Sequence, residues 1–369
     1  MSIFSRFFKP KTETRDDPSW QHITPQSHYS GIVGDINPRL AENLSTVHAA
    51  VELITNALAT LPPKIYKHDG TTRMHATDHA LNYLLRKPNR YSSWPEFIRN
   101  LIADVLLYGN GIAIWRDNSL HWVPYRQVII EQLQSGKLRY SYTPLVVTGG
   151  SNQHYQRVAM EDRVLHIRDR GDSLVGVPRL SRCSATVNLA LAIQQGAMTL
   201  WEKGCFPSGA LISKSRLDNK QRQHLQDGLQ QKMLGSANRG GVFILDGDMS
   251  YQPIEISPEK VEFIEQRKFM VREIARVFNL SPILLGDLEN ASYSNTAQSA
   301  RYLAKFTLQY WTRLFEATFS DLLLADDEQL ELDLSIFTKG DTKERWDAYK
   351  IALEQGVLKP EDVRRLEGY

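Results

Sequence analysis

Residues 95–115, PEFIRNLIADVLLYGNGIAIW, contain both kinds of secondary structure from which the fold is built. A helix is predicted from Pro95 to Tyr108, because proline suits the first helical turn. The helix should end at Gly109-Asn110-Gly111, since glycine readily adopts the positive φ of a helix C-terminus. A short strand over 112–115 follows at once. This stretch therefore joins a helical part of the chain to a run of short strands, and such separate runs of helices and strands indicate an α+β protein.

The same two patterns recur on both sides of this stretch. Upstream, apolar spacing and turn residues predict a helix over 44–61 stopped by Pro62-Pro63, a strand over 64–67 and a helix over 78–86. Downstream, short apolar runs between turns predict strands over 121–123, 128–130, 138–142 and 164–167. These strands are expected to form a small β-rich module between helical parts.

The second half of the chain is expected to be mostly helical. The predicted helices are 179–203, 218–233, 258–279 with Ser257 as N-cap, 296–324 capped by Asn295 with Gln298, and a terminal helical unit over 341–369 broken at Gly356. The predicted strands are 209–212, 240–245 and 330–337. An irregular segment over 286–295 separates two long helices, and such loops are often functional.

The composition excludes several classes of protein. The chain has 369 residues, which suggests about two to three domains at roughly 150 residues each. Its 44 basic and 42 acidic residues give a net charge of +2, too balanced for a polybasic DNA binder. The two cysteines, Cys183 and Cys205, form no Cys-x-x-Cys pair and no disulfide scaffold. We find no secretory signal and no transmembrane segment, so a reducing cytoplasm is expected.

Common catalytic motifs are missing from the sequence. It has no P-loop, no Gly-x-Gly-x-x-Gly, no His-Glu-x-x-His and no Gly-x-Ser-x-Gly. His75 and His79 have helical ligand spacing, but a third ligand is lacking, so a structural or solvent-facing role is favoured. Asp246 and Asp248 flank Gly247 and are explained by a hairpin turn. We therefore expect no enzymatic activity, no metal and no cofactor.

One charge pattern is more informative. Lys268, Arg272 and Arg276 recur every four residues on the predicted helix 258–279, with Arg267 beside them. Acidic residues occupy the first half of that helix, so dipole complementation and i,i+4 pairing explain the pattern simply. The alternative is a basic stripe that faces an anion or polyanion.

Several short motifs, taken in order, carry a resemblance to a known family. They are Asn43-Leu-Ser-Thr-Val47, Leu61-Pro62, His79-Ala-Leu81, Pro88-Asn89, Tyr108-Gly-Asn110, Val164-Leu-His166-Ile167, Gly176-Val-Pro178, Pro207-Ser-Gly209, Phe278-Asn-Leu-Ser-Pro282, Leu285-Gly286, Ser294-Asn295 and Gly356-Val-Leu-Lys-Pro-Glu361. Each motif alone is weak, but their order and spacing are specific. From about residue 40 onward, the sequence resembles the portal proteins of tailed bacteriophages, in the branch shared by siphophages, prophages and gene transfer agents.

The resemblance implies a ring, usually of twelve subunits, around an axial DNA channel at one capsid vertex. It divides the chain from residue 41 onward into a wing (41–180 and 297–340), stem helices (181–205 and 258–285), a clip (206–257), a tunnel loop (286–296) and a short crown (341–369). The composition of residues 1–40, rich in Pro, Ser, Thr and charge, predicts a flexible N-terminal arm. The chain ends soon after the last family helix, so a long terminal barrel is not expected.

The resemblance also assigns expected site residues. The channel-lining residues of the stem would be Arg267, Lys268, Arg272 and Arg276. The tunnel loop would present Asn290, Ser292, Tyr293, Ser294 and Asn295. The clip would face terminase or the connector through Lys220, Arg222, Lys232 and Arg239. These assignments come from the family, whereas the helices and strands come from the residue pattern.

The expected partners follow from the same resemblance. They are further copies of this chain, the major capsid protein, the terminase large subunit, a head–tail connector and double-stranded DNA without sequence specificity. The expected location is the portal vertex of the virion, after assembly in the bacterial cytoplasm and without a membrane.

Two other classes of function remain open from the sequence. Asp218-Asn-Lys220 and Asp341-Thr-Lys343 are reminiscent of a metal-dependent nuclease. A non-channel adaptor protein is the other alternative.

Overall fold

The structure is a computed structural model of the whole chain. It describes residues 20–22, 36–69, 72–133, 136–144, 157–171, 174–202, 209–213, 218–220, 223, 249–253, 263–289, 293–338 and 342–367. Contacts within the chain define two compact units. The first comprises Met1–Ala190 with Lys268–Tyr369, and the second comprises Leu191–Arg267.

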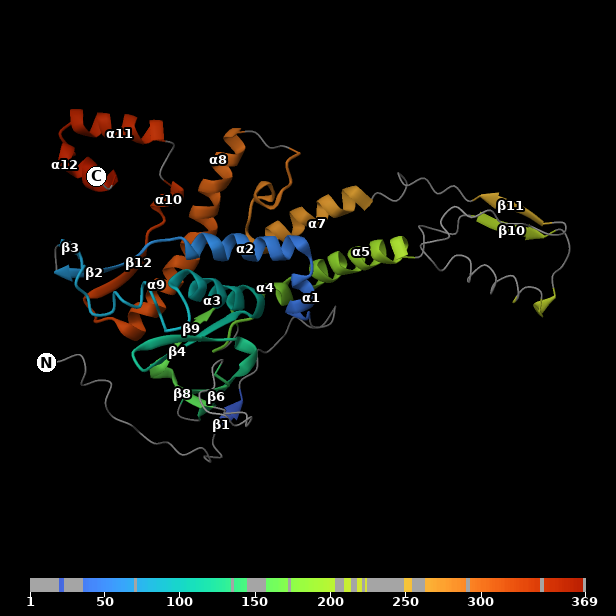
Figure 1. Ribbon diagram of the computed structural model, residues 1–369, viewed down its shortest axis with the longest axis horizontal. Helices are drawn as coiled ribbons and strands as arrows, with labels where there is room; N and C mark the ends of the chain where they lie inside the picture. The colour runs from blue at the N-terminus through green and yellow to red at the C-terminus, as the bar shows by residue number, and fades with distance from the viewer. Residues whose placement is uncertain are drawn as a thin grey trace. The chain divides into compact units, whose positions relative to one another are not determined.

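The core of the first unit is a packed pair of helices covered by a third, longer helix. Helices α2 (Ser45–Ala59) and α3 (Trp94–Tyr108) lie side by side (Figure 1). The third helix comprises α8 (Tyr293–Tyr302), a π-helical segment η7 (Leu303–Leu308) and α9 (Gln309–Leu323). Trp94 at the start of α3 makes edge contacts with Phe315 and Phe319 of α9. All three rings are nearly or fully buried, so their burial stabilises the unit strongly.

Three antiparallel sheets belong to this unit. Their strand orders are β12 (Glu328–Leu332)–β2 (Pro63–Asp69)–β3 (Thr72–His75), β5 (Ser119–Val123)–β4 (Asn110–Arg116)–β9 (Val164–Arg168), and β1 (Trp20–His22)–β6 (Val128–Leu133)–β7 (Leu138–Tyr142)–β8 (Arg157–Met160). The second and third sheets share an apolar cluster that includes Ile112, Val123 and Tyr140. Strand β4 starts directly after α3, so this sheet is fixed to the helical core.

The remaining elements of the first unit are short helices. They are α1 (Pro38–Glu42), η2 (Tyr125–Gln127), η3 (Glu161–Arg163), α4 (Arg179–Arg182), η6 (Pro282–Leu285), α10 (Ser335–Thr338), α11 (Thr342–Glu354) and α12 (Pro360–Glu367). Helices α11 and α12 are joined through Gly356, whose φ is +70°. The carboxylate of Glu367 accepts hydrogen bonds from Arg345 and Tyr349, which holds α12 against α11.

Two helices belong partly to each unit. Helix α5 (Ser184–Glu202) begins in the first unit, and α7 (Phe263–Phe278) ends there. In the second unit, β10 (Gly209–Ser213) pairs with β11 (Met249–Pro253) in antiparallel register. No helix of the described residues is both long enough and apolar enough to cross a membrane.

Most of the predicted elements are confirmed. The helices over 44–61 and 95–108 are α2 and α3, and the five strands predicted between 112 and 167 are all present. Gly109 adopts φ +78°, as expected at the end of α3. The structure adds two strands to the β-rich module, β8 and β1, and β1 lies inside the stretch expected to be a flexible arm.

Four predictions of helix or strand bounds are wrong. Residues 78–86 form successive turns, because amide groups such as those of Asn82 and Leu84 donate to the carbonyl three residues earlier. The helix after Pro178 breaks at Cys183 into α4 and α5. Strand β12 ends at Leu332, and the short helix α10 follows it. The helix expected to begin at 296 begins at Tyr293, so Asn295 with Gln298 is not its cap.

The interruption of the long helix has an identifiable cause. Asn279, just after α7, adopts φ +56° and makes three hydrogen bonds to the long helix, two to η7 and one to the last residue of α8. Its Nδ2 donates to the carbonyl of Phe306 at 2.8 Å, its Oδ1 accepts from the Tyr302 hydroxyl at 2.9 Å, and its carbonyl accepts from Thr307 Oγ1 at 2.5 Å. A π-helical turn frees backbone groups, which such side chains can satisfy.

Most of the predicted helix at 218–233 lies outside the described residues. The predicted strand at 240–245 and the predicted N-cap Ser257 lie wholly outside them.

Candidate functional site

Two sequence motifs that lie far apart in the chain meet just before α4. Asn110, fully buried, donates through Nδ2 to the carbonyl of Gly176 at 2.9 Å and accepts on Oδ1 from the Gly176 amide at 2.7 Å. The amide of Asp169 also donates to the Gly109 carbonyl at 2.9 Å. A Cβ on Gly109 would lie 2.7 Å from the carbonyl carbon of Val177. The backbones of the two motifs are therefore in contact, and only glycine fits at position 109.

A buried histidine extends this junction into the β-rich module. His166 Nε2 lies 3.1 Å from Asn110 Oδ1, and its Nδ1 lies 3.1 Å from the Tyr140 hydroxyl. Burial, with a smaller contribution from Arg168, lowers the pKa of His166 to about 3. The ring is therefore neutral at physiological pH. Nε2–H donates to Asn110, and the Tyr140 hydroxyl donates to Nδ1.

A buried aspartate holds α4, the short helix that follows Pro178. Asp169 Oδ2 accepts from Arg179 Nε at 2.7 Å and lies 2.9 Å from Arg182 Nη2. The Asp169 side chain is 3% exposed, so this double ion pair is largely desolvated. The Arg179 guanidinium also lies 4.7 Å from the ring of buried Trp311, a cation–π geometry. The contact with Trp311 fixes α4 to α9.

The predicted basic stripe on α7 is matched by two carboxylates. Arg272 Nε donates to Asp287 Oδ2 at 2.6 Å, and its Nη2 bonds to Glu289. The ammonium of Lys268 also bonds to Glu289. We name these four residues the stem clamp, because they tie the segment after η6 back onto α7. With two cations and two carboxylates, the stem clamp is electrically neutral.

The charges of the stem clamp stabilise one another. Hydrogen bonding to Arg272 lowers the pKa of Asp287, and hydrogen bonding to Lys268 and then Arg272 lowers the pKa of Glu289. The same contacts raise the pKa of Arg272. A carboxylate with a lowered pKa stabilises above its ordinary pKa and loses that contribution as pH falls through the lowered value. The clamp therefore stays closed at neutral pH.

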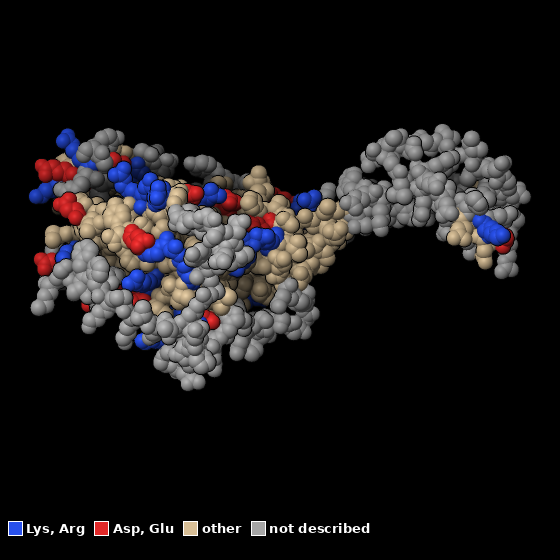
Figure 2. All heavy atoms as spheres, turned by 60° about the horizontal axis from the view of Figure 1, so that its bottom comes forward, with Lys and Arg blue, Asp and Glu red and all other residues tan. Residues whose placement is uncertain are grey.

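The other stem residues are more exposed. Arg276 pairs with Glu273 on the same helix, and Arg267 is exposed on α7. On the face of the molecule shown in Figure 2, basic and acidic side chains are interspersed rather than gathered into one field. The structure places Lys268 and Arg272 next to Asp287 and Glu289, which the sequence analysis did not include among the site residues. Whether the four stem cations line a channel stays a prediction.

The predicted loop and clip sites are only partly described. Tyr293, Ser294 and Asn295 belong to the first turn of α8 rather than to an irregular loop. The backbone carbonyl of Asn295 accepts from Ser299 Oγ at 2.8 Å, as in a helix. Lys220 is exposed. The other predicted positions, Asn290, Ser292, Arg222, Lys232 and Arg239, lie outside the described residues.

The two histidines considered as ligands have structural roles. His79 Nδ1 accepts from the Leu81 amide at 3.1 Å, so its Nε2–H donates to Glu328 at 3.2 Å. His75 ends β3 and lies against the ring of Tyr66. Within the described ranges, no group of three or more His, Cys, Asp or Glu side chains could hold a metal ion. Asp246 and Asp248 are outside those ranges.

The comparisons with known proteins agree on one fold. A chain from the virion of a native gene transfer agent particle superposes with a TM-score of 0.62 and 23% identity, covering 91% of this chain and 94% of that one. A chain from the neck of such a particle, computed with C12 symmetry, gives a TM-score of 0.60 and 21% identity, with 94% of both chains covered. An HK97-family phage portal protein from Corynebacterium diphtheriae gives a TM-score of 0.56 and 15% identity, covering 81% of this chain and 96% of that one. The fold is therefore that of portal proteins.

The sequence comparisons identify the family. The probable portal protein of Streptomyces phage phiC31 is 24% identical over 386 positions, covering 99% of this chain and 84% of that protein. The portal protein of Enterobacteria phage HK97 is 24% identical over 355 positions, covering 91% and 82%. The phage portal protein family matches residues 45–368. This chain belongs to that family, and the resemblance noted in the sequence is confirmed.

Proposed function

We propose that this chain assembles into a twelve-membered ring at one vertex of a capsid, and that double-stranded DNA enters and leaves through its centre. The observation that carries the proposal is the fold match over 94% of the chain to a protein from a particle neck with C12 symmetry. The near-neutral charge of the chain suits this role. Twelve modestly charged copies attract DNA without trapping it, because binding strength grows with each phosphate contact.

The ring would dock to different partners in turn. During packaging it would bind a terminase through the clip, where Lys220, Arg222, Lys232 and Arg239 are candidate contacts. Head–tail connector proteins would then replace terminase, and the wing would contact the major capsid protein. Nucleotide hydrolysis belongs to terminase in this scheme, which is consistent with the missing P-loop. Assembly would take place in the bacterial cytoplasm.

Helix α7 is the proposed channel wall, with Arg267, Lys268, Arg272 and Arg276 as lining residues. The stem clamp supports a specific version of this role. Because Asp287 and Glu289 neutralise Lys268 and Arg272, the wall would present polar pairs rather than bare cations. The segment 286–296, which includes the first turn of α8, would narrow the tunnel next to it. A wall of paired charges holds DNA weakly at any one place, so the duplex can slide.

A charge-balance experiment tests this role. The double variant Lys268→Gln/Arg272→Gln leaves two carboxylates per subunit unpaired, and we expect on the order of tenfold less packaged DNA, because the wall now repels phosphate. The measurement is nuclease-protected DNA per particle, with the gene for this chain complemented in its own phage or phage-like element. Particles made without the chain should contain no DNA.

The matched control neutralises the whole stem clamp. In Lys268→Gln/Arg272→Gln/Asp287→Asn/Glu289→Gln, the net charge is unchanged, and packaging should stay near the wild-type level. Ring formation by both variants is checked by negative-stain imaging, because the Arg272–Asp287 pair is partly buried and its loss also affects stability. If the double variant forms rings and packages DNA like the wild type, α7 does not face DNA.

A further inference from the structure

A closed loop before α3 is held rigidly against the neighbouring sheet. The amide of Trp94 donates to the carbonyl of Arg86 at 3.2 Å, which joins the two ends of the loop. At its centre, the carbonyl of Pro88 accepts from the Leu120 amide at 2.9 Å, and Asn89 Nδ2 donates to the Leu120 carbonyl at 2.8 Å. Residues 87–93 are therefore pinned to β5 in the manner of a strand pair.

Asn89 also organises the second half of the loop from inside. Its side chain is buried, and its Oδ1 accepts from the Tyr91 amide at 2.9 Å and from the Ser92 amide at 3.0 Å. On the other side, the Tyr83 hydroxyl donates to the Asn118 carbonyl at 2.5 Å. Side chains that project from this loop thus start from fixed backbone positions, which lowers the entropy lost on binding.

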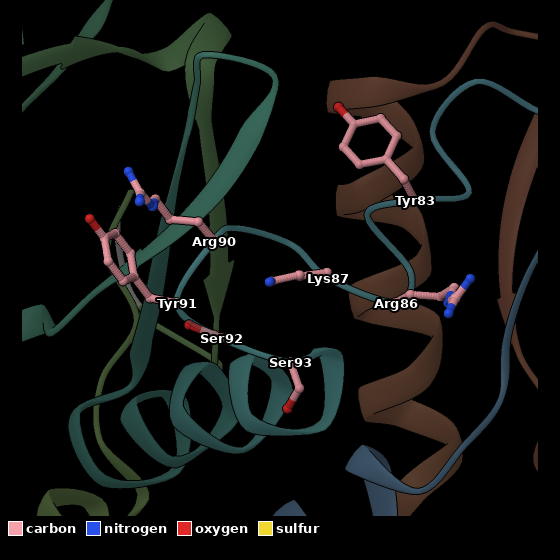
Figure 3. A pocket seen from close by; sticks show the side chains of 7 residues that line it. All are labelled: Tyr83, Arg86, Lys87, Arg90, Tyr91, Ser92 and Ser93. Carbon is pink, nitrogen blue, oxygen red and sulfur yellow. The ribbon is translucent and has the colours of Figure 1, made fainter.

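The loop surrounds a pocket of about 520 Å³ with an unusual lining. The lining residues are Tyr83, Arg86, Lys87, Arg90, Tyr91, Ser92 and Ser93. Figure 3 shows Lys87 pointing into the gap, with Arg90 and Tyr91 on one side and Tyr83 on the other. The Arg86 side chain points in the direction opposite to that of Lys87. Three cations, two phenol rings and two hydroxyls thus share one small surface, and no carboxylate lines it.

The three cations differ from those of the stem clamp. Arg86, Lys87 and Arg90 are exposed, and none forms an ion pair with a carboxylate in the part of the chain that the structure describes. The nearest acid along the chain is Glu96, in the first turn of α3 and outside the lining. Elsewhere in this unit, cations such as Lys67, Arg99 and Arg139 do have carboxylate partners. The pocket therefore keeps a positive charge that the fold itself does not neutralise.

We propose that this pocket binds the phosphodiester backbone of double-stranded DNA, at a site separate from the proposed channel wall on α7. Arginine, lysine, serine and tyrosine are the side chains that most often contact DNA phosphates. An acidic protein segment would also meet the charge, but charged residues are depleted from the cores of protein interfaces, and three of the seven lining residues carry a charge. Tyrosine and arginine occur in both kinds of interface, so the second probe described below separates the two ligands. This inference rests on the proposed function in one respect only, namely that double-stranded DNA is present near the assembled chain.

The test is the salt dependence of DNA binding. The variant Arg86→Gln/Lys87→Gln/Arg90→Gln is compared with the wild type on a fluorescent 30-base-pair duplex by anisotropy, with both proteins in the same oligomeric state. Loss of three phosphate contacts lowers the slope of log affinity against log salt by about 2.7. Between 50 and 200 mM salt, the wild type should therefore lose roughly 40-fold more affinity than the variant.

A control variant and a second probe complete the experiment. Lys137→Gln/Arg157→Gln/Arg163→Gln removes the same charge from exposed positions in and beside the four-stranded sheet, and its slope should match the wild type. Equal slopes for the wild type and the pocket variant would overturn the proposal, and so would an equal loss in the control variant. The second probe is a fluorescent polyglutamate peptide. If only peptide binding depends on the pocket, the ligand is an acidic protein segment and the proposal is wrong. Binding to free duplex is independent of packaging, so failure here leaves the proposed function untouched.

Discussion

Replacement of Asn110 by leucine is expected to lower the free energy of unfolding by about 3–5 kcal/mol, since each buried polar group left unpaired costs about 1–3 kcal/mol. The side chain is fully buried and bonds to both backbone groups of Gly176 and to His166. Leucine has a similar volume, so the loss reports hydrogen bonds rather than a cavity. Urea unfolding at neutral pH, followed by tryptophan fluorescence, measures the effect.

Asn56 provides the matched control for this substitution. It lies exposed on α2, and among the described residues its side chain bonds only to Glu52. Asn56→Leu should change stability by less than about 0.5 kcal/mol, as surface substitutions usually do. A small effect of Asn110→Leu, comparable to the control, would mean that the two motifs do not depend on this amide for their contact.

Replacement of Asp169 by alanine is the second change with a large expected effect. Arg179 and Arg182 would be left without their shared carboxylate while only 17% and 14% of their side chains are exposed. Removal of one partner from a buried ion pair typically costs about 3–5 kcal/mol. Because this carboxylate holds α4 in place, we also expect formation of the proposed ring to fail. Thermal unfolding and particle mass are measured on the same sample.

Asp162→Ala is the control for Asp169→Ala, because Asp162 is an exposed carboxylate in the short helix η3. It should unfold within about 0.5 kcal/mol of the wild type and assemble normally. If Asp169→Ala assembles as well as Asp162→Ala, the double ion pair does not determine how the stem is attached.

The local elements of this fold were largely predictable from the sequence. The helix over 95–108 and its end at Gly109 follow from proline, apolar spacing and glycine, all of which act within a few residues. Residues 78–86 were predicted as a helix on the same grounds but form turns. Their amides bond to carbonyls three residues back, and Asn82 caps carbonyls of the preceding turn instead of continuing a helix. Polar side chains that compete for backbone groups are hard to weigh from sequence alone.

The site was harder to predict, because its partners are distant in the chain. The sequence pointed to Lys268 and Arg272, whereas the structure adds Asp287 and Glu289 some fifteen to twenty-one positions later. An acidic segment that follows a basic helix is a usable signal for such pairing. The contact of Asn110 with Gly176 spans 66 positions, and both lie in motifs that the resemblance singled out. Only the fold reveals that these motifs are one structural feature.

The measurement that most directly tests the ring is particle mass. The purified chain, produced with its capsid protein, is analysed by mass photometry and by negative-stain imaging. The proposed function predicts a closed ring with a central hole and a mass near twelve times the 42.2 kDa chain. A chain that stays monomeric or dimeric in the presence of its capsid protein would contradict the account.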